Sequence, residues 1–357
     1  MAGFPRLSAT HAARPRFVDS SSAVWYTWFD RMTRTSHPFP IAHTLLIGLV
    51  ALAAAMPASA QNERAGTTVF QFVRIGIAAR PMGMGGAFTA VADDPHAIQW
   101  NPAGLAFVRF PEGTTSYMSY FAGVDAGAVS FVQPVGKMAG FAFAASYLRV
   151  GGLQTTTTAN RTGDGLSTFS ANDLALSVAF GGRVAERLFF GMTGSFLYEG
   201  ITAFEGFSTT AGSFDAGLLY KTGFHGLTGG LALRHFGSQF ALYQATSERL
   251  PLTIAGGVSA RPFTRRLLVA VEVEKPRDND VGVNAGAEYQ IVRDFFVRSG
   301  YRSLDARIGN DAVNGDLAGL TFGIGIAGDR RYKVDYAFTS LADLGDVHRI
   351  TLAVTFR

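Results

Sequence analysis

Alternation of apolar and polar residues with a period of two is the feature that most constrains this chain. It runs from about residue 113 to the end, in segments of eight to twelve residues. The last segment places four apolar residues at every second position: Ile350, Leu352, Val354 and Phe356. Successive side chains of a β-strand point to opposite faces, so the pattern predicts strands. Beyond the N-terminal region there is no apolar run of about 20 residues, which excludes membrane-spanning helices there.

The low charge of the chain decides which environment the apolar faces meet. Charged residues make up 16% of the sequence and hydrophobic residues 48%, whereas a typical soluble domain is about 25% charged. The apolar face is therefore predicted to contact lipid and the polar face to line a lumen. An open sheet edge would leave backbone groups unsatisfied in hydrocarbon, so the sheet must close into an antiparallel transmembrane β-barrel, an all-β fold. The absence of Cys is typical of chains that cross an oxidising periplasm.

Fourteen segments carry the alternation, an even number as bacterial barrels require. Every second connection between them is short, and the others include the longest irregular stretches: 151–169, 201–210, 237–250 and 303–316. This predicts short periplasmic turns and long external loops, for a barrel over residues 113–357 in the outer membrane of a Gram-negative-type bacterium. The predicted strands are 113–121, 125–135, 138–150, 170–181, 187–200, 211–222, 227–236, 251–260, 264–275, 280–291, 294–302, 317–328, 330–340 and 346–357.

The N-terminal region reads as a secretory signal. Residues 41–55 form an apolar core, and residues 56–60 end in a small-residue cleavage site. We expect a cleaved signal peptide over 32–60, a true start at Met32, and a mis-called extension over 1–31. Removing residues 1–60 removes five Arg and two Asp, which leaves 26 basic and 25 acidic residues and a net charge of +1. With no clustered basic run either, nucleic acid is not an expected partner.

Residues 61–112 do not alternate, and they are rich in Ala, Gly, Met and Pro. A segment of this length is predicted to be an N-terminal plug inside the lumen of a 14-stranded barrel. Its glycines permit close backbone approach, and its Asp-Asp-Pro and Asn-Pro-Ala-Gly sequences predict turns. The candidate residues for ligand or partner contact are Met82, Gly83, Met84, Gly85, Gly86, Phe88, Asp93, Asp94, Trp100, Asn101 and Pro102. The alternative is that these residues only shape the fold.

The stretch from Ala79 to Leu105 resembles the N-terminal region of the PorV/PorQ family of outer-membrane proteins. It resembles more distantly the FadL-type transporters, whose plug has a similar Asn-Pro-Ala turn. The chain end, with Val334 to Phe338 and Leu344 to Leu352, is similar to the same family. One departure is that such barrels usually end on an aromatic residue, whereas here Arg357 follows Phe356.

No feature of the sequence predicts an enzyme, a cofactor or a metal site. Residues 323–328 match a dinucleotide-binding fingerprint, but they lie in an alternating segment with a further strand after it, which makes the match a chance one. The histidines after residue 60 are outside any recognisable nucleophile motif, so a lipase or a protease is not favoured: His96, His225, His235 and His348.

Two functions remain open. The resemblance implies a non-catalytic platform of the type IX secretion kind, whose external loops contact secreted cargo, other secretion components or a surface-attachment complex. The alternative is a FadL-like transporter of a hydrophobic small molecule, which needs an apolar pocket between plug and wall. Charges predicted to face the lumen are of mixed sign, which predicts pairing rather than an open selective pore: Glu272, Glu274, Glu288, Arg298, Arg302, Lys333 and Asp335.

Overall fold

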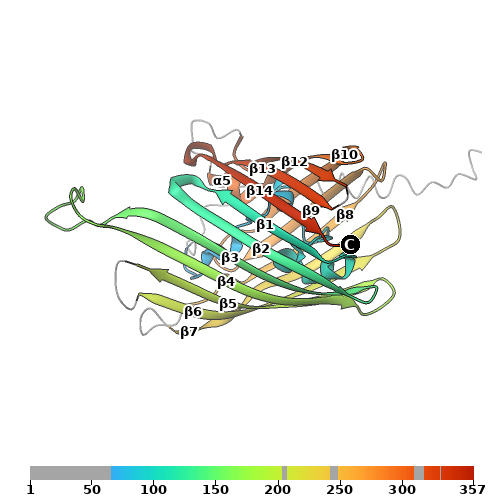
Figure 1. Ribbon diagram of the computed structural model, residues 1–357, viewed down its shortest axis with the longest axis horizontal. Coiled ribbons are helices and arrows are strands. Elements are labelled where there is room, and N and C mark those ends of the chain that lie inside the picture. Colours follow the sequence, from blue (N-terminus) through green and yellow to red (C-terminus); the bar gives the residue numbers. More distant parts are fainter. Residues whose placement is uncertain (1–65, 203–206, 242–247, 309–316, 330) are drawn as a thin grey trace, which may run out of the picture. The chain divides into compact units, whose positions relative to one another are not determined.

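Fourteen antiparallel strands form a closed barrel in the computed structural model (Figure 1). The structure describes residues 66–202, 207–241, 248–308, 317–329 and 331–357. Each strand pairs with its neighbours in sequence, and β1 pairs with β14 from Glu112↔Thr355 to Ser119↔His348. The closed barrel expected from the sequence is confirmed. The expected extension and signal peptide, residues 1–60, lie outside the described residues.

Every predicted strand has its counterpart in the structure. The largest differences are β3 and β7, which continue four and five residues past the predicted strand ends at the loop end, as Figure 1 shows for the long β3–β4 hairpin. Their added residues are a mixture of glycine, polar and apolar residues without regular alternation, so the hydropathy pattern does not reveal them. The strands are β1 (Glu112–Ser119), β2 (Val124–Val135), β3 (Ala139–Gln154), β4 (Thr168–Arg183), β5 (Leu188–Ile201), β6 (Ser208–Lys221), β7 (Thr228–Ala241), β8 (Thr253–Ala260), β9 (Leu267–Pro276), β10 (Gly282–Val292), β11 (Phe295–Arg302), β12 (Leu320–Gly328), β13 (Tyr332–Ser340) and β14 (Asp346–Thr355).

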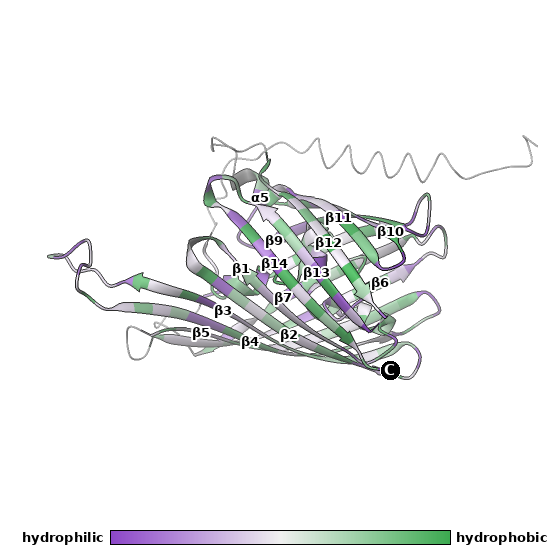
Figure 2. Cartoon of the chain, turned by 45° about the horizontal axis from the view of Figure 1, so that its top comes forward, coloured by the Kyte–Doolittle hydropathy of each residue, from purple (hydrophilic) through white to green (hydrophobic). Residues whose placement is uncertain are grey.

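The two faces of the wall differ as the alternation predicts. On the outside, Leu176 and Val178 of β4 are 47% and 52% exposed. Ala179, the next residue along the strand, faces inward and is buried. Figure 2 shows hydrophobic and hydrophilic residues alternating along the strands. A wall that exposes its large apolar side chains outward suits a lipid environment.

Short and long connections mark the two ends of the barrel. One end, here called the turn end, carries the turns after β2, β4, β6, β8, β10 and β12, and the C-terminus. The other, the loop end, carries the connections after the odd-numbered strands, among them η3 (Phe121–Gly123), α5 (Ser303–Ile308) and η5 (Ala342–Leu344). In bacterial barrels the short turns face the periplasm.

Residues 66–111, here called the N-terminal segment, lie inside the barrel (Figure 1). The segment starts at the loop end, where the Val69 amide donates to the Arg249 carbonyl. It finishes at the turn end, where the Pro111 carbonyl accepts from the Phe356 amide. It contains η1 (Gln71–Arg74), α3 (Ala79–Gly83), α4 (Ala97–Trp100) and η2 (Pro102–Phe107). No helix in the described part of the chain has the length and hydropathy of a membrane span.

The segment and the inner wall form two apolar clusters. Nearer the turn end, Phe88, Leu105 and other segment residues pack on Val132, Ala179 and Leu219 of the wall. Nearer the loop end, Phe70 and Phe72 pack on Met118, Leu148 and Leu197. The lumen is therefore filled by the chain's own N-terminal segment over most of the barrel's length.

A charge on the outer face should destabilise the barrel according to its depth. Val178→Arg places a cation near the middle of β4 and is expected to cost about 2–4 kcal/mol of folding free energy. Val184→Arg, just beyond the end of β4 on the same face, is expected to cost about 0–1 kcal/mol. Denaturant unfolding in lipid vesicles measures both. Equal losses would contradict the assignment of this face to lipid.

Candidate functional site

The Asn101–Pro102 turn fixes the middle of the N-terminal segment. Asn101 is fully buried, and its side-chain amide donates to the carbonyls of Thr89 (2.8 Å) and Leu218 (3.0 Å). Its side-chain oxygen accepts from the Ala103 amide (3.2 Å) and so caps η2. One side chain therefore starts the helix, joins it to the preceding loop and ties it to strand β6.

A row of wall glycines receives this turn. Gly140, Gly181, Gly191 and Gly217 are in register on the neighbouring strands β3, β4, β5 and β6. A Cβ at Gly181 or Gly191 would overlap the backbone of Pro102, and one at Gly217 would overlap the Asn101 side chain. Only a wall without side chains lets η2 approach this closely.

A second glycine patch holds the loop after α3. Gly286 of β10 and Gly300 of β11 are in register, and a Cβ at either would overlap the backbone of Met84 or Gly85. Gly85 has φ +64°, and a Cβ there would lie 2.6 Å from the Ala285 carbonyl oxygen. Gly83, the last residue of α3, and Gly86 flank this contact.

The apolar residues of the motif are core residues of the segment. Met84 and Phe88 are fully buried, and the Phe88 and Trp100 rings meet edge to face at 5.9 Å. Met82 and Trp100 are also buried, and both border a small pocket. That pocket is polar, as described below, so these four residues do not enclose an apolar pocket of the kind a hydrophobe transporter needs.

Arg80 of α3 connects the segment to the wall through charge. Its guanidinium contacts Asp93 (2.6 Å) and Asp94 (2.7 Å) of the segment, and Glu288 of β10 (2.9 Å). Glu288 also accepts from Arg298 of β11 (2.8 Å). Arg298 in turn reaches Asp335 of β13 (2.6 Å). Three of the predicted lumen charges thus form one network with the Asp93–Asp94 turn.

The same network holds Asp94 in its charged form. Burial alone would raise the pKa of this carboxyl. Electrostatic interactions with His96 and Arg80 outweigh burial and hold the pKa of Asp94 below its usual range. Asp94 also accepts a hydrogen bond from the His96 amide (2.9 Å), so its carboxylate has both this amide and the Arg80 guanidinium as donors.

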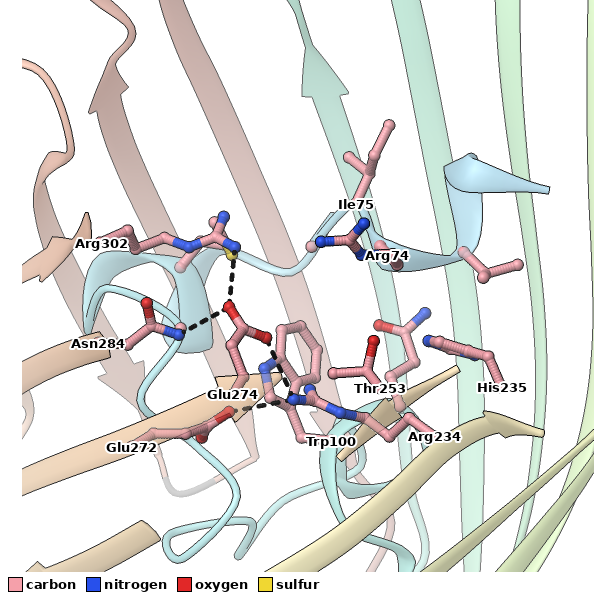
Figure 3. Close-up of a pocket in the computed structure, with 15 residues that line it drawn as sticks. Arg74, Ile75, Trp100, Arg234, His235, Thr253, Glu272, Glu274, Asn284 and Arg302 are labelled. Carbon is pink, nitrogen blue, oxygen red and sulfur yellow. Dashed lines mark hydrogen bonds and ion pairs between the residues drawn. The ribbon is translucent and has the colours of Figure 1, made fainter. Parts of the chain in front are cut away.

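A second network surrounds Glu272 and Glu274 of β9 (Figure 3). Glu272 accepts from the amides of Phe88 (3.0 Å) and Thr89 (2.8 Å), which join the segment to the wall. Arg234 of β7 contacts Glu272 (3.1 Å) and Glu274 (3.4 Å). Figure 3 shows Arg302 reaching Glu274 from the opposite side, at 3.8 Å.

Wall hydroxyls complete the contacts around the barrel. Thr351 of β14 accepts from the Ala79 amide (2.9 Å), and Thr321 of β12 accepts from the Gly85 amide (3.0 Å). Lys333, the remaining predicted lumen charge, lies at the turn end and is 44% exposed. Its ammonium contacts Glu112 of β1 (3.4 Å) and so links two strands rather than wall and segment.

Two pockets bordered by charged residues lie between segment and wall. The one nearer the loop end, here called the outer pocket, has about 60 Å³ of water-accessible space beside Arg74, Arg234, Arg302 and Trp100. The other pocket has about 200 Å³ of water-accessible space and borders the Arg80 network near the turn end. At the outer pocket, Arg234 Nε, Asn284 Oδ1 and Arg302 Nε have no partner among the described residues. The space is large enough for a few waters that could bond to these groups.

Sequence reasoning finds the motif residues and misses their main partners. Arg80 lies within the motif, but its wall partner Glu288 is 208 residues away. The ion pair of Arg74 with Asp278 (3.2 Å) depends on η1 meeting the β9–β10 connection. The described residues contain no group of three or more His, Cys, Asp or Glu that could hold a metal.

Comparisons with known proteins agree with this architecture. Residues 58–226 match the family described as type IX secretion system protein PorV. A comparison with curated proteins found no match. The CymD monoaromatic hydrocarbon channel is 14% identical with a TM-score of 0.55, over 79% of this chain and 98% of that one.

Two further solved structures are similar to the same degree. The Pseudomonas putida toluene transporter TodX is 14% identical with a TM-score of 0.53, over 78% of this chain and 97% of that one. A Pseudomonas aeruginosa FadL homologue is 14% identical with a TM-score of 0.53, over 82% of this chain and the whole of that one. At such identities the similarity shows the FadL-like barrel fold alone.

Loss of Arg80 should destabilise the barrel strongly. Arg80→Met leaves Asp94 and Glu288 buried without this partner, which typically costs about 3–5 kcal/mol. Lys333→Gln is the control, because its half-exposed pair is worth about 0–1 kcal/mol. In a chain without residues 1–60, Trp100 is the only Trp, so its fluorescence during denaturation reports on the segment. Equal effects of the two substitutions would contradict the role given to Arg80.

The wall glycines give a second test. Gly191→Ala places a Cβ against the Pro102 backbone and is expected to cost about 1–3 kcal/mol through overpacking. Gly194→Ala lies on the same strand with nothing within 4 Å of the new Cβ and should change stability by less than about 0.5 kcal/mol. Trp100 fluorescence during unfolding measures both. A neutral Gly191→Ala would show that η2 does not depend on this close contact.

Proposed function

We propose that this chain, an outer-membrane β-barrel that carries a PorV family domain, is a non-catalytic platform for protein secretion or surface attachment. The observation that carries the proposal is the fixed N-terminal segment. It is held by two glycine patches, two buried ion networks and wall hydroxyls, in a lumen whose two described pockets beside it are bordered by many charged residues. A barrel filled in this way is suited to present a surface.

The loop end is the surface that we assign to partners. The β3–β4 hairpin reaches furthest there (Figure 1), and its tip is ordered by its own hydrogen bonds. The Thr155 amide donates to the Ser167 carbonyl (3.1 Å), and Asn160 accepts from the Gly163 amide (2.9 Å). A preformed loop binds at a lower entropic cost than a disordered one. Secreted proteins or other secretion components are the partners that family membership suggests.

Transport of a hydrophobic molecule is the second candidate. It is favoured by the fold shared with channels such as TodX and CymD, whose names describe a toluene transporter and a monoaromatic hydrocarbon channel. In this chain, transport through the lumen would require the N-terminal segment to move. That movement would break the buried ion pairs of Arg80 and separate Glu272 from two backbone amides.

A disulfide between segment and wall separates the two candidates. A Cβ at Gly83 would lie 3.6 Å from that of Ala337, within the range of about 3.5–4.5 Å that a disulfide needs. The chain has no Cys of its own, so Gly83→Cys with Ala337→Cys forms a single bridge. In cells without another copy, the locked protein should support surface attachment of secreted proteins within about twofold of the two single-Cys controls, because a platform does not need the segment to move.

Uptake of a monoaromatic hydrocarbon into vesicles that contain the same variants completes the test. A platform predicts equal uptake for locked, reduced and single-Cys proteins. Uptake that locking abolishes and a reductant restores would favour transport. Surface attachment that is lost on locking and restored by reduction would contradict a static platform.

A further inference from the structure

The fold gathers basic residues at the turn end that are scattered in the sequence. The eight named below lie in or beside five of the six turns and at the C-terminus. The exposed acidic residues in the described parts of these turns are Glu186, Asp294 and Asp329. The exposed basic residues include Lys137, Arg183, Arg187, Arg265, Arg266, Arg293, Arg331 and Arg357. This end of the barrel therefore carries a positive rim.

An apolar hollow lies on the outer face directly beside two of these cations. It has about 310 Å³ of water-accessible space and is bordered by Lys137 and Arg183. Its floor is a row across β3, β4 and β5, in which Ala139 pairs with Gly182 and Gly182 with Phe190. The small residues Ala139 and Gly182 leave a depression between larger apolar neighbours.

The two cations at this hollow are not used by the protein itself. Neither Lys137 nor Arg183 forms an ion pair or a side-chain hydrogen bond with any described residue. Both are exposed, at the level where the apolar outer face gives way to the turns. A pair of unpartnered cations above an apolar depression matches a molecule with an anionic head and a hydrocarbon tail.

A second hollow continues along the same strands towards the middle of the wall. It offers about 830 Å³ beside Phe143, Val178 and Gly194. Val178 is four residues from Gly182 on β4, which corresponds to about 13 Å along a strand. At a strand tilt of about 35–45° this is about 10 Å of depth, less than half of a hydrocarbon core of about 30 Å. An acyl chain that starts at the hollow beside Lys137 therefore reaches the hollow beside Val178 within one leaflet.

We propose that this face binds an anionic phospholipid of the periplasmic leaflet. The phosphate lies between Lys137 and Arg183, and one acyl chain runs over Ala139 and Gly182 towards Val178. The site lies on the outer wall, apart from the N-terminal segment, and it does not depend on which function the lumen or the loops perform. A bound lipid would fix the orientation of the β2–β5 wall in the membrane.

Lipid titration of the folded barrel in detergent, followed by native mass spectrometry, tests the site. The probes are phosphatidylglycerol and phosphatidylethanolamine with identical acyl chains. The unmodified protein should bind phosphatidylglycerol at least fivefold more tightly. Lys137→Gln with Arg183→Gln should weaken that binding roughly tenfold or more, because each basic side chain near an anionic surface contributes a factor of about five. Ala139→Leu, which fills the floor, should weaken both lipids.

Arg265→Gln with Arg266→Gln is the matched control, since it removes two charges from the same rim away from the hollow. Its effect on phosphatidylglycerol should stay below about twofold, and heat resistance on gels confirms that each variant is folded. Equal binding of the two lipids, or equal weakening by the two double variants, would overturn the proposal. Unchanged lipid binding in the Lys137/Arg183 variant would also overturn it, and would leave an acidic periplasmic protein as the partner of the rim.

Discussion

The packing and the charge balance of the lumen both depend on the N-terminal segment. A barrel of fourteen strands is too wide for its wall side chains to fill. The inner wall also carries charges that are costly to bury without partners. Arg80 contacts Glu288, and the amides of Phe88 and Thr89 contact Glu272. Without the segment, these wall carboxylates would lose partners that the wall alone does not replace.

The segment is held differently on the two sides of the barrel. On the side of β3 to β6, glycines such as Gly181 and Gly191 let the backbone of η2 lie directly on the sheet, so close packing holds it there. On the side of β9 to β11, the wall carboxylates Glu272 and Glu288 hold it through the Phe88 and Thr89 amides and the Arg80 guanidinium, beside the second glycine patch. Removing either kind of contact leaves the other in place. A segment anchored on opposite walls by two kinds of contact is not an easily displaced gate.

Most of the fold could be predicted from the sequence, because the strands of a lipid-facing barrel alternate apolar and polar residues with a period of two. Residues 346–355 illustrate this, since their alternation, strand and outward face all agree. The ends of β3 and β7 were not accessible, because their glycine and polar residues are as common in loops as in strand ends that reach into solvent. The glycines of the motif predicted close approach, and Gly85 makes such a contact.

The wall residues that contact the N-terminal segment could not be predicted from the sequence in the same way. Whether Gly181 and Gly191 lie side by side depends on strand register, which local alternation does not specify. The link from Arg80 to Glu288 likewise requires the whole barrel to close around the segment. The positive rim at the turn end is a third example, since its members are neighbours only after folding.

The central claim is that the N-terminal segment is a fixed part of the lumen, and hydrogen exchange of the barrel in a lipid bilayer tests it most directly. The amides of residues 79–107 that are hydrogen-bonded, such as Phe88 and Asn101, should exchange as slowly as those in the middle of β5. Fast exchange across residues 79–107, alongside protected strands, would contradict the claim and show a segment that leaves the wall.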